Sequence, residues 1–353
     1  MSRLKDLLIS RIRAAGPMTV AEYMTTCLMH PEDGYYTTRD PFGAKGDFIT
    51  APDISQMFGE LVGLALAQSW MDRGAPTPFN LVELGPGRGT LMADIMRATK
   101  HVQGFHEGAQ LHLIEGSLNL KAAQKGAIKH PLTHHDSFES VPAGPVFLIA
   151  NEFFDALPIR QFLRDGDGWR ERVIGIVDEV LAFGLSDPMK PELLNARLAD
   201  TKNGDLVETS TSTTATVRSI GQRIFDEGGV AYIFDYGSEI SLGDTFQALK
   251  AHKKIDPLET PGMADLTAHV DFGALALASH PAATSASTPQ GMFLERLGIT
   301  ERARALAANL EGQPLDTHIA AHRRLTHAAE MGTLFKVIAL FAPDTPIPPG
   351  VSM

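Results

Sequence analysis

The sequence has one cysteine, Cys27, no apolar run of 18 residues, and fewer basic than acidic residues. A single cysteine excludes an intramolecular disulfide and a closed cysteine metal site, and it favours a reducing compartment. Without a long apolar run, no segment is predicted to span a membrane. The 31 Lys and Arg residues against 42 Asp and Glu residues give a net charge of −11. That charge argues against a nucleic-acid partner, which needs a basic face, and is compatible with a basic protein segment.

The length of 353 residues and the 44% apolar content are typical of a globular protein of about two domains. The first 18 residues lack the apolar stretch and cleavage site of a secretory signal. They fit either a basic amphipathic transit peptide or a first helix with Leu4, Leu7, Leu8 and Ile12 on its apolar face. We favour the helix.

Residues 79–150 alternate short apolar runs with helical patterns. The run 81–84 predicts a buried strand, Gly85, Gly87 and Gly89 predict a sharp turn, and residues 90–100 predict a helix. Such an order is the opening of a nucleotide-binding α/β unit. Further strands are expected at 111–115, 131–135, 146–150 and 230–234, and a helix at 117–126. The alternation predicts a mostly parallel sheet with both faces covered.

The pattern changes after residue 158. Residues 159–185 predict three antiparallel strands, a meander inserted in the α/β core. Residues 201–214 predict a polar loop, and residues 237–268 an irregular segment. The remaining elements are expected to be helices at 215–225, 272–279, 291–297, 301–310 and 316–330, and a last strand at 334–341.

The glycine turn has the spacing Gly85-x-Gly87-x-Gly89, which differs from the G-x-G-x-x-G of dinucleotide enzymes. Glycines there let the backbone approach a ligand closely. Glu83 would oppose a pyrophosphate but suit a cation. These residues favour S-adenosylmethionine, which carries a sulfonium and an ammonium, over NAD. The alternative is that the glycines only permit a strand-to-helix turn.

Acidic residues also follow the next two strands. Glu115 can accept the hydroxyls of a ribose, and Asp136 with Ser137 stands where recognition of the adenine amino group is expected. The alternative for Glu115 is a solvated carboxylate at a strand end. Because parallel strands place ligands at their carboxyl ends, three such coincidences favour a cofactor site.

The motif from Asn151 to Pro158 directly follows the fourth strand. It differs from the Asn-Pro-Pro-aromatic tetrapeptide that holds a flipped base, so a base nitrogen is a poor substrate candidate. Glu152 and Asp155, with Phe153 and Phe154, can hold a guanidinium, a planar cation that pairs with carboxylates and stacks on rings. The alternative is a connection with both phenylalanines in the core.

Together these segments resemble the MidA-like methyltransferases, a family that includes a mitochondrial complex I assembly factor which methylates an arginine. The resemblance runs from about residue 7 to 341. The segments that carry it are Gly34–Tyr36, Gly46–Glu60, Glu83–Gly89, Asn151–Pro158, Asp235–Gly237, Asp265–Phe272 and Met331–Val337.

The resemblance implies a Rossmann-like class I methyltransferase fold with a mostly parallel seven-stranded sheet, and S-adenosyl-L-methionine as cofactor. It also implies a protein arginine N-methyltransferase that acts on a respiratory complex I subunit. A non-catalytic cofactor-binding assembly factor and a small-molecule methyltransferase remain alternatives. Similarity begins almost at residue 1, so a bacterial cytoplasmic protein is expected rather than one of the mitochondrial matrix. Either a monomer or a homodimer is compatible with the sequence.

The family motifs suggest further site residues. Thr50, Ser55 and Gln56 can reach the methionine end of the cofactor, with a helix from Ile54 to Leu66 above the pocket, and Asn151 is a further cofactor residue. Alternatively, Asp53 and Gln56 form a helix cap. His269 can accept a proton, although a histidine at a helix start is more often structural.

We expect no metal site, because His318 and His322 lack the glutamate of a zinc-binding helix. The expected domains are an N-terminal helical cap at 1–75 and an antiparallel β insertion at 159–212. The methyltransferase core takes residues 76–158 and 213–353, with a helical insertion at about 238–330.

Overall fold

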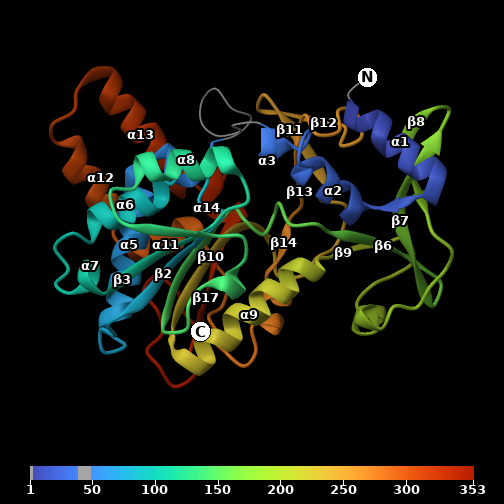
Figure 1. Ribbon diagram of the computed structural model, residues 1–353. Coiled ribbons are helices and arrows are strands. Elements are labelled where there is room, and N and C mark those ends of the chain that lie inside the picture. Colours follow the sequence, from blue (N-terminus) through green and yellow to red (C-terminus); the bar gives the residue numbers. More distant parts are fainter. Residues whose placement is uncertain (1–2, 39–48) are drawn as a thin grey trace. The chain divides into compact units, whose positions relative to one another are not determined.

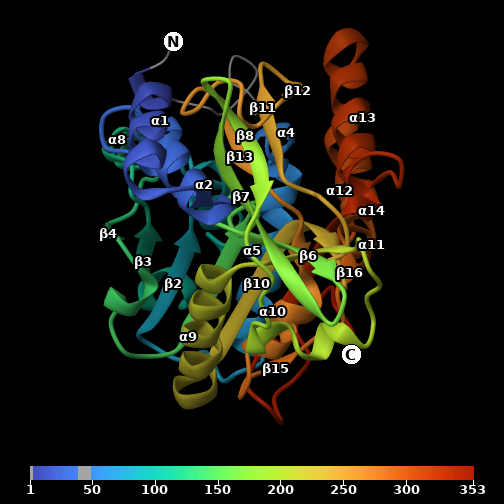
Figure 2. The same ribbon diagram turned by 90° about the vertical axis from the view of Figure 1, so that its right-hand side faces the viewer.

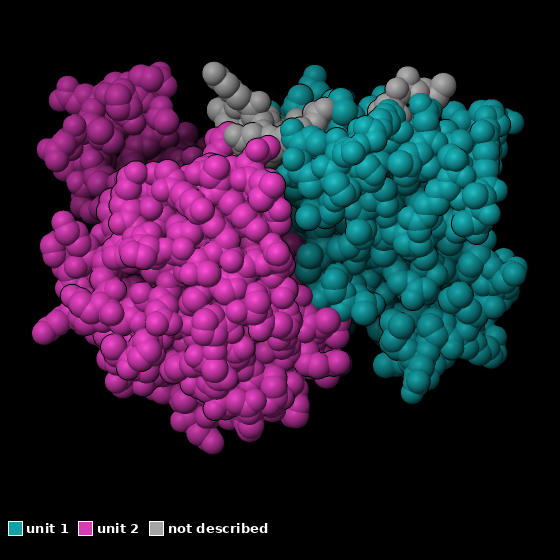
Figure 3. Space-filling view, viewed as in Figure 1, with its two compact units in different colours: residues 1–48, 155–213, 240–270 teal, residues 49–154, 214–239, 271–353 magenta. Residues whose placement is uncertain are grey.

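A computed structural model of the protein describes residues 3–38 and 49–353, which fall into two compact units (Figures 1 and 3). Each unit is assembled from three stretches of the chain. Unit 1 comprises Met1–Phe48, Asp155–Thr213 and Ile240–Val270, and unit 2 comprises Ile49–Phe154, Thr214–Glu239 and Asp271–Met353. These units are drawn differently from the domains expected above, whose boundaries stay a prediction.

Unit 2 is built on a mostly parallel sheet, as the sequence predicts. The strand order is β15-β17-β10-β5-β2-β3-β4, and β16 also pairs with β17. Strands β4, β3, β2, β5 and β10 are parallel, whereas β17 runs antiparallel to β10. Figure 2 shows β4, β3 and β2 side by side. The bounds are β2 (Phe79–Leu84), β3 (Ala109–Ile114), β4 (Leu132–His135), β5 (Val146–Asn151), β10 (Gly229–Ser238), β15 (Ala283–Thr284), β16 (Thr288–Pro289) and β17 (Phe335–Phe341).

Helices cover this sheet, which is why its central strands are mostly apolar and buried. Every residue of β2 and β5 is buried. The helices are α4 (Ala51–Ile54), α5 (Gln56–Met71), α6 (Thr90–Ala98), α7 (Phe105–Gly108), α8 (Leu118–Ala127), α9 (Thr211–Glu227), α10 (Phe272–Ala278), α11 (Gln290–Arg296), α12 (Ile299–Ala307), α13 (Gly312–Thr326), α14 (Met331–Leu334) and the 3₁₀ helix η1 (Phe138–Ser140).

Helices α5 and α6 cross closely because α5 carries glycines at the contact. A Cβ on Gly63 would lie 2.9 Å from Cα of Ile95, which is closer than side chains approach in proteins. Beside this crossing, the buried carboxylate of Glu60 accepts hydrogen bonds from Arg97 (2.6 Å) and Arg302 (2.8 Å). This ion-pair cluster joins α5, α6 and α12.

Unit 1 contains the predicted antiparallel meander. Its main sheet has the order β1-β7-β6-β9, with β8 paired to β7, and a smaller sheet has the order β12-β11-β13. The bounds are α1 (Arg3–Ala15), β1 (Met18–Thr19), α2 (Val20–Met29), α3 (Tyr35–Thr38), β6 (Arg160–Asp165), β7 (Gly168–Val177), β8 (Val180–Leu185), η2 (Glu192–Leu194), η3 (Ala196–Leu198), β9 (Leu206–Thr209), β11 (Gln247–Lys250), β12 (Lys253–Ile255) and β13 (Asp265–Thr267). The two-residue strand β14 (Val270–Asp271) spans a boundary between the two units.

Three expectations for unit 1 were wrong in detail. Residues 201–214 are not only a loop, because β9 lies within them and pairs with β6. Residues 237–268 are not irregular, since they supply the three strands of the smaller sheet. In α1 the buried stripe includes Ile9, while Leu7 is 38% exposed. These strands have four residues or fewer, so pairing rather than a local pattern defines them.

Every helix in residues 3–38 and 49–353 is too short or too polar to cross a membrane. The same residues contain no cluster of three histidine, cysteine, aspartate or glutamate side chains suited to a metal ion. His318 and His322 instead contact neighbouring residues of α12, the carbonyl of Ala303 (3.0 Å) and the hydroxyl of Thr300 (3.2 Å).

Candidate functional site

The parallel strands of unit 2 end at one edge of the sheet, and most of the predicted site residues follow them there. The pairing brings Leu84 beside Ile114 on one side and beside Ala150 on the other. The residues that come next along the chain are therefore neighbours. They are Gly85 after β2, Glu115 after β3 and Glu152 after β5.

The glycine turn after β2 needs glycine for backbone and for packing reasons. Gly85, Gly87 and Gly89 all have positive φ values, of 60°, 52° and 83°. A Cβ on Gly85 would lie 2.8 Å from the ring of Phe153. Gly89 is the N-terminal cap of α6. The turn therefore presents bare backbone at the edge of the sheet, where a ligand can approach it.

Glu83 stands two residues before the turn and is 3% exposed. Burial raises the pKa of its carboxyl to about 8, and a hydrogen bond from the backbone N–H of Met92 opposes this shift only in part. Its Oε2 atom has no hydrogen-bond partner among the described residues. A buried carboxyl with spare acceptor capacity suits a cationic ligand.

Glu115 is held from two sides at the end of β3. Its Oε1 accepts the backbone N–H of Ser117 (2.8 Å), and its Oε2 accepts Nε2 of Gln124 (3.1 Å). Burial raises the pKa of this carboxyl. The hydroxyl of Ser117 is buried and, within the described part of the chain, has no partner.

Sequence reasoning missed Ser117 and Gln124. Gln124 follows Leu120 by four residues, and both lie on the buried face of α8. Helical periodicity therefore predicts that this glutamine is buried, and a buried glutamine was the sign in the sequence that could have identified it.

Glu152 directly follows β5 and has a fixed carboxylate. Its Oε1 accepts the backbone N–H of Ala51 (3.2 Å) and Nδ2 of Asn151 (3.1 Å). The φ of Glu152 is +52°, a conformation that costs energy for a residue with a side chain and is concentrated at functional sites. Oδ1 of Asn151 is buried and finds no partner in the described residues.

Asp235, in the last part of β10, holds this loop. It is fully buried, and its carboxylate accepts the backbone N–H groups of Phe154 (3.0 Å) and Tyr236 (3.0 Å). The backbone N–H of Glu152 also donates to the carbonyl of Phe234 (2.9 Å). The sequence marked Asp235 as a strand end without a role, and the structure identifies it as a support for the loop.

The segment 50–56 reaches both sides of the site. Oδ1 of Asp53 accepts the hydroxyl of Thr90 (3.2 Å), which follows the glycine turn. Ser55 caps α5 by accepting the backbone N–H of Met57 (3.2 Å), so the alternative cap by Asp53 and Gln56 is wrong.

Other details of that segment also differ from expectation. Helix α5 extends over Gln56–Met71 rather than Ile54–Leu66. Thr50 precedes α4 without a side-chain cap, and Gln56 is exposed. Residues 46–48 of the predicted motif lie outside the described residues.

The structure does not bring every predicted residue to this edge as a buried group. The side chain of Asp136 is 90% exposed and pairs with Lys121 (2.9 Å), which lowers its pKa. Ser137 is exposed at the start of η1. Both remain predictions as adenine-binding residues.

Asp155 and His269 belong to unit 1. The backbone N–H of Ala268 donates to the carbonyl of Asp155 (2.9 Å), and that of His269 donates to the hydroxyl of Thr245 (2.8 Å). His269 also lines a pocket of about 400 Å³ with Thr245 and Phe246. The two residues therefore lie close together in unit 1, and their catalytic roles remain predictions.

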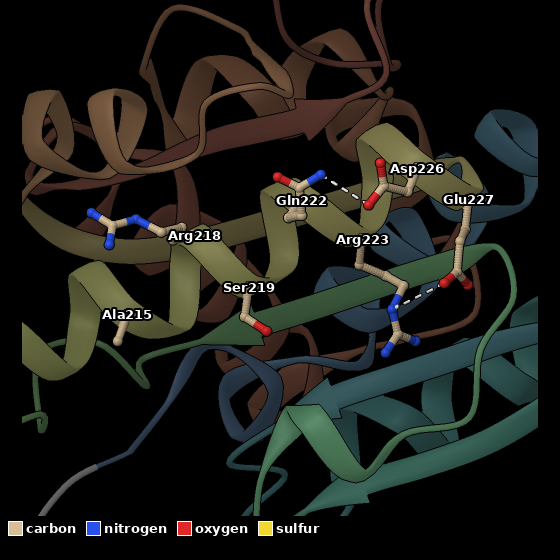
Figure 4. Close-up of a pocket in the computed structure, with 7 residues that line it drawn as sticks. All are labelled: Ala215, Arg218, Ser219, Gln222, Arg223, Asp226 and Glu227. Carbon is tan, nitrogen blue, oxygen red and sulfur yellow. Dashed lines mark hydrogen bonds and ion pairs between the residues drawn. The ribbon is translucent and has the colours of Figure 1, made fainter.

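A larger pocket of about 470 Å³ lies along α9 (Figure 4). Its polar side chains already pair with one another, Gln222 with Asp226 (2.9 Å) and Arg223 with Glu227 (3.5 Å). It includes none of the predicted site residues, and α9 ends where β10 begins, at the opposite edge of the sheet. We therefore place the candidate site at the carboxyl edge of the sheet.

The chain is similar to known methyltransferases along nearly its whole length. A family model for S-adenosyl-L-methionine-dependent methyltransferases matches residues 61–289. The chain is 37% identical to the Drosophila melanogaster mitochondrial protein arginine methyltransferase NDUFAF7 homolog, over 96% of this chain and 84% of the relative. It is 36% identical to human mitochondrial protein arginine methyltransferase NDUFAF7, over 94% of this chain and 82% of the relative.

Among solved structures, the chain resembles a Burkholderia thailandensis protein bound to S-adenosyl-homocysteine, with a TM-score of 0.84 and 28% identity. That match covers 98% of this chain and 93% of the other.

The residues at the carboxyl edge fit S-adenosyl-L-methionine, the cofactor of this family. The glycine turn leaves room for close approach, and the buried carboxyls of Glu83 and Glu115 suit an ammonium and a ribose diol. Among residues 3–38 and 49–353, Oε2 of Glu83, Oγ of Ser117 and Oδ1 of Asn151 have no hydrogen-bond partner, which leaves them capacity for bonds with a polar ligand.

Replacing Gly85 by alanine is expected to weaken the binding of S-adenosyl-homocysteine by about 10- to 100-fold. The new Cβ meets Phe153 in a backbone conformation that disfavours side chains, at a cost of about 1–3 kcal/mol. Calorimetric titration measures the loss. Gly74→Ala is the matched control, since Gly74 has a φ of +81° and open space around it. Equal affinities for Gly85→Ala and Gly74→Ala would contradict the role of this contact.

The matched family model, the relatives that cover nearly the whole chain, and the fit of the carboxyl edge to the cofactor agree. The chain therefore belongs to the family of S-adenosyl-L-methionine-dependent methyltransferases.

Proposed function

We propose that the protein is an arginine N-methyltransferase whose substrate is a side chain of another protein, on a subunit of respiratory complex I. The observation that carries the proposal is Glu152, a carboxylate fixed beside the cofactor turn by Ala51 and Asn151. The names of the relatives, protein arginine methyltransferase NDUFAF7, support the choice of arginine. We infer a location in the bacterial cytoplasm, which the bacterial relative supports, although the curated relatives are named as mitochondrial.

The cofactor site of the proposal uses the residues that follow the strands. Glu83 pairs with the ammonium, Glu115 accepts the ribose hydroxyls, and Asn151 binds the cofactor beside Glu152. Thr50 and Ser55 face the methionine end. Bound S-adenosyl-L-methionine supplies an electrophilic methyl group on a sulfonium.

Arginine is a weak nucleophile, because its lone pairs are delocalised and its pKa lies above about 12. A carboxylate is needed to orient the guanidinium and to stabilise positive charge on it during transfer. Glu152 meets this need because its carboxylate is held beside the glycine turn by the backbone N–H of Ala51 and by Nδ2 of Asn151. In the proposal this carboxylate pairs with the guanidinium of the substrate, and the half-buried ring of Phe153 supplies a stacking face.

The test is mass spectrometry of methylated arginines in cells with and without the protein. We expect one methylarginine peptide, from a respiratory complex subunit, to disappear on deletion and to return with the wild-type gene. Deletion without any change in protein methylarginine would overturn the proposal. It would leave the two alternatives, a cofactor-binding assembly factor and a small-molecule methyltransferase.

A further inference from the structure

A single buried side chain, Gln124, joins two parts of the cofactor edge that come from different strands. Its Nε2 donates to the carbonyl of Gly87 (2.7 Å), in the glycine turn after β2. The same nitrogen donates to Oε2 of Glu115 (3.1 Å), after β3. An amide nitrogen carries two N–H groups, so both are used. Gln124 is fully buried, so water does not compete for these bonds.

The other end of the amide is held by a histidine. Oε1 of Gln124 lies 2.7 Å from Nε2 of His134 on β4, and since an amide oxygen only accepts, this ring nitrogen carries the hydrogen. Turning the amide over would direct its oxygen at the Gly87 carbonyl and the Glu115 carboxylate, all acceptors. These two acceptors therefore fix the orientation in which Gln124 donates to the site, and His134 satisfies its oxygen.

Packing reinforces the same contact. A Cβ on Gly89 would lie 3.3 Å from Cα and 3.4 Å from Cγ of Gln124. Helix α8 thus lies directly against the last glycine of the turn at this residue. Movement of Gln124 would shift both the turn and the carboxylate.

We propose that Gln124 is a positioning residue which selects ligands with a ribose diol. It does so by holding the Glu115 carboxylate at a fixed position relative to the glycine turn. Oε1 of Glu115 accepts the backbone N–H of Ser117, and Oε2 accepts Nε2 of Gln124. These two bonds fix the orientation of the carboxylate and therefore the direction in which it can accept hydrogen bonds from a ligand. The inference rests on the proposed role of Glu115 at the ribose.

The experiment compares two ligands, S-adenosyl-homocysteine and its 2′,3′-dideoxy counterpart, by calorimetric titration of the full chain. Gln124→Met keeps the side-chain length and removes the donors. We expect this variant to bind S-adenosyl-homocysteine about 10- to 100-fold more weakly, because hydrogen bonds to a charged group are among the stronger ones. The affinity for the dideoxy ligand should change by at most about threefold, since this ligand lacks the hydroxyls that donate to Glu115. Equal weakening of both ligands would overturn the inference.

Gln290→Met is the matched control. Gln290 is also fully buried in unit 2, and its Nε2 donates to the carbonyl of Leu325 (3.0 Å), away from the glycine turn. We expect both variants to lower the melting temperature of the ligand-free protein and only Gln124→Met to change the ratio of the two affinities. A changed ratio in Gln290→Met would contradict a specific role for Gln124.

Glu115→Gln separates this inference from the assignment on which it rests. If Glu115→Gln leaves the affinity for S-adenosyl-homocysteine unchanged, the proposed ribose role of Glu115 is wrong and the inference falls with it. If Glu115→Gln weakens binding and Gln124→Met does not, the inference alone is wrong. In the double variant, we expect Gln124→Met to add less than threefold, because the carboxylate that it positions is absent.

Discussion

Glu152→Gln is expected to lower the rate of methyl transfer by at least about 100-fold and to leave cofactor affinity within about threefold. The amide keeps the volume of the side chain, and its oxygen can still accept from Ala51 and Asn151. The loop therefore stays in place, while the charge that faces the guanidinium is lost. The measurement is transfer of labelled methyl from S-adenosyl-L-methionine to lysate proteins of a strain that lacks the gene.

The matched control for this experiment is Glu107→Gln. Glu107 is an exposed residue of α7, next to the start of β3 and thus at the opposite edge of the sheet. The Glu107→Gln variant should transfer methyl groups at the wild-type rate. An undiminished rate in Glu152→Gln would remove Glu152 from the reaction. A rate loss with an equal loss of cofactor affinity would reassign it to cofactor binding.

The core of unit 2 was predictable because burial on both faces leaves a plain pattern. Strands β2 and β5 are buried along their whole length, and the sequence already marked Glu83 near the end of β2 and Asn151 at the end of β5. The small strands of unit 1 have no such pattern. Strand β9 carries Glu208, whose buried carboxylate is satisfied by Gln161 and Thr245, and this contact cannot be foreseen from neighbouring residues.

The same limit applies to the site. Glu115 and Glu152 could be found because the first ends a predicted strand and the second lies two residues beyond another. Asp136 also follows one, but β4 is the last strand in the sheet order, so its end is open to solvent and Asp136 pairs with Lys121. Gln124 could not be found in this way, because its role depends on a helix and three strands meeting at one amide.

A second large effect is expected for the protonation of Glu83 when the ligand binds. Because burial raises the pKa of Glu83 to about 8, most of the ligand-free protein holds this carboxyl protonated at pH 7. A cation bound beside it lowers that pKa, so binding of S-adenosyl-homocysteine at pH 7 should release about one proton. Titration in buffers of different ionisation enthalpy measures this number. In Glu83→Gln we expect no release from this site and an affinity lower by about 10- to 100-fold.

The stability of Glu83→Gln should change in the opposite direction from its affinity. The carboxyl has a pKa of about 8 when folded and an ordinary value of 4.5, so the folded state holds a proton that the unfolded chain loses. The free energy of unfolding is therefore highest below pH 4.5 and falls by about 3 kcal/mol by pH 7. Glutamine does not titrate, so the ligand-free variant should melt above the wild type at pH 8.

Glu208→Gln distinguishes a binding carboxyl from a merely buried one. Burial also raises the pKa of Glu208, but its carboxylate is satisfied by Thr245 and Gln161 within unit 1. This variant should change stability and leave proton release on binding at about one. Were Glu83→Gln to melt below the wild type at pH 8 and still release the proton, Glu83 would be a structural residue. If Glu83→Gln instead gains stability and loses affinity, Glu83 is a ligand-binding residue whose charged form is stabilised by the bound cation.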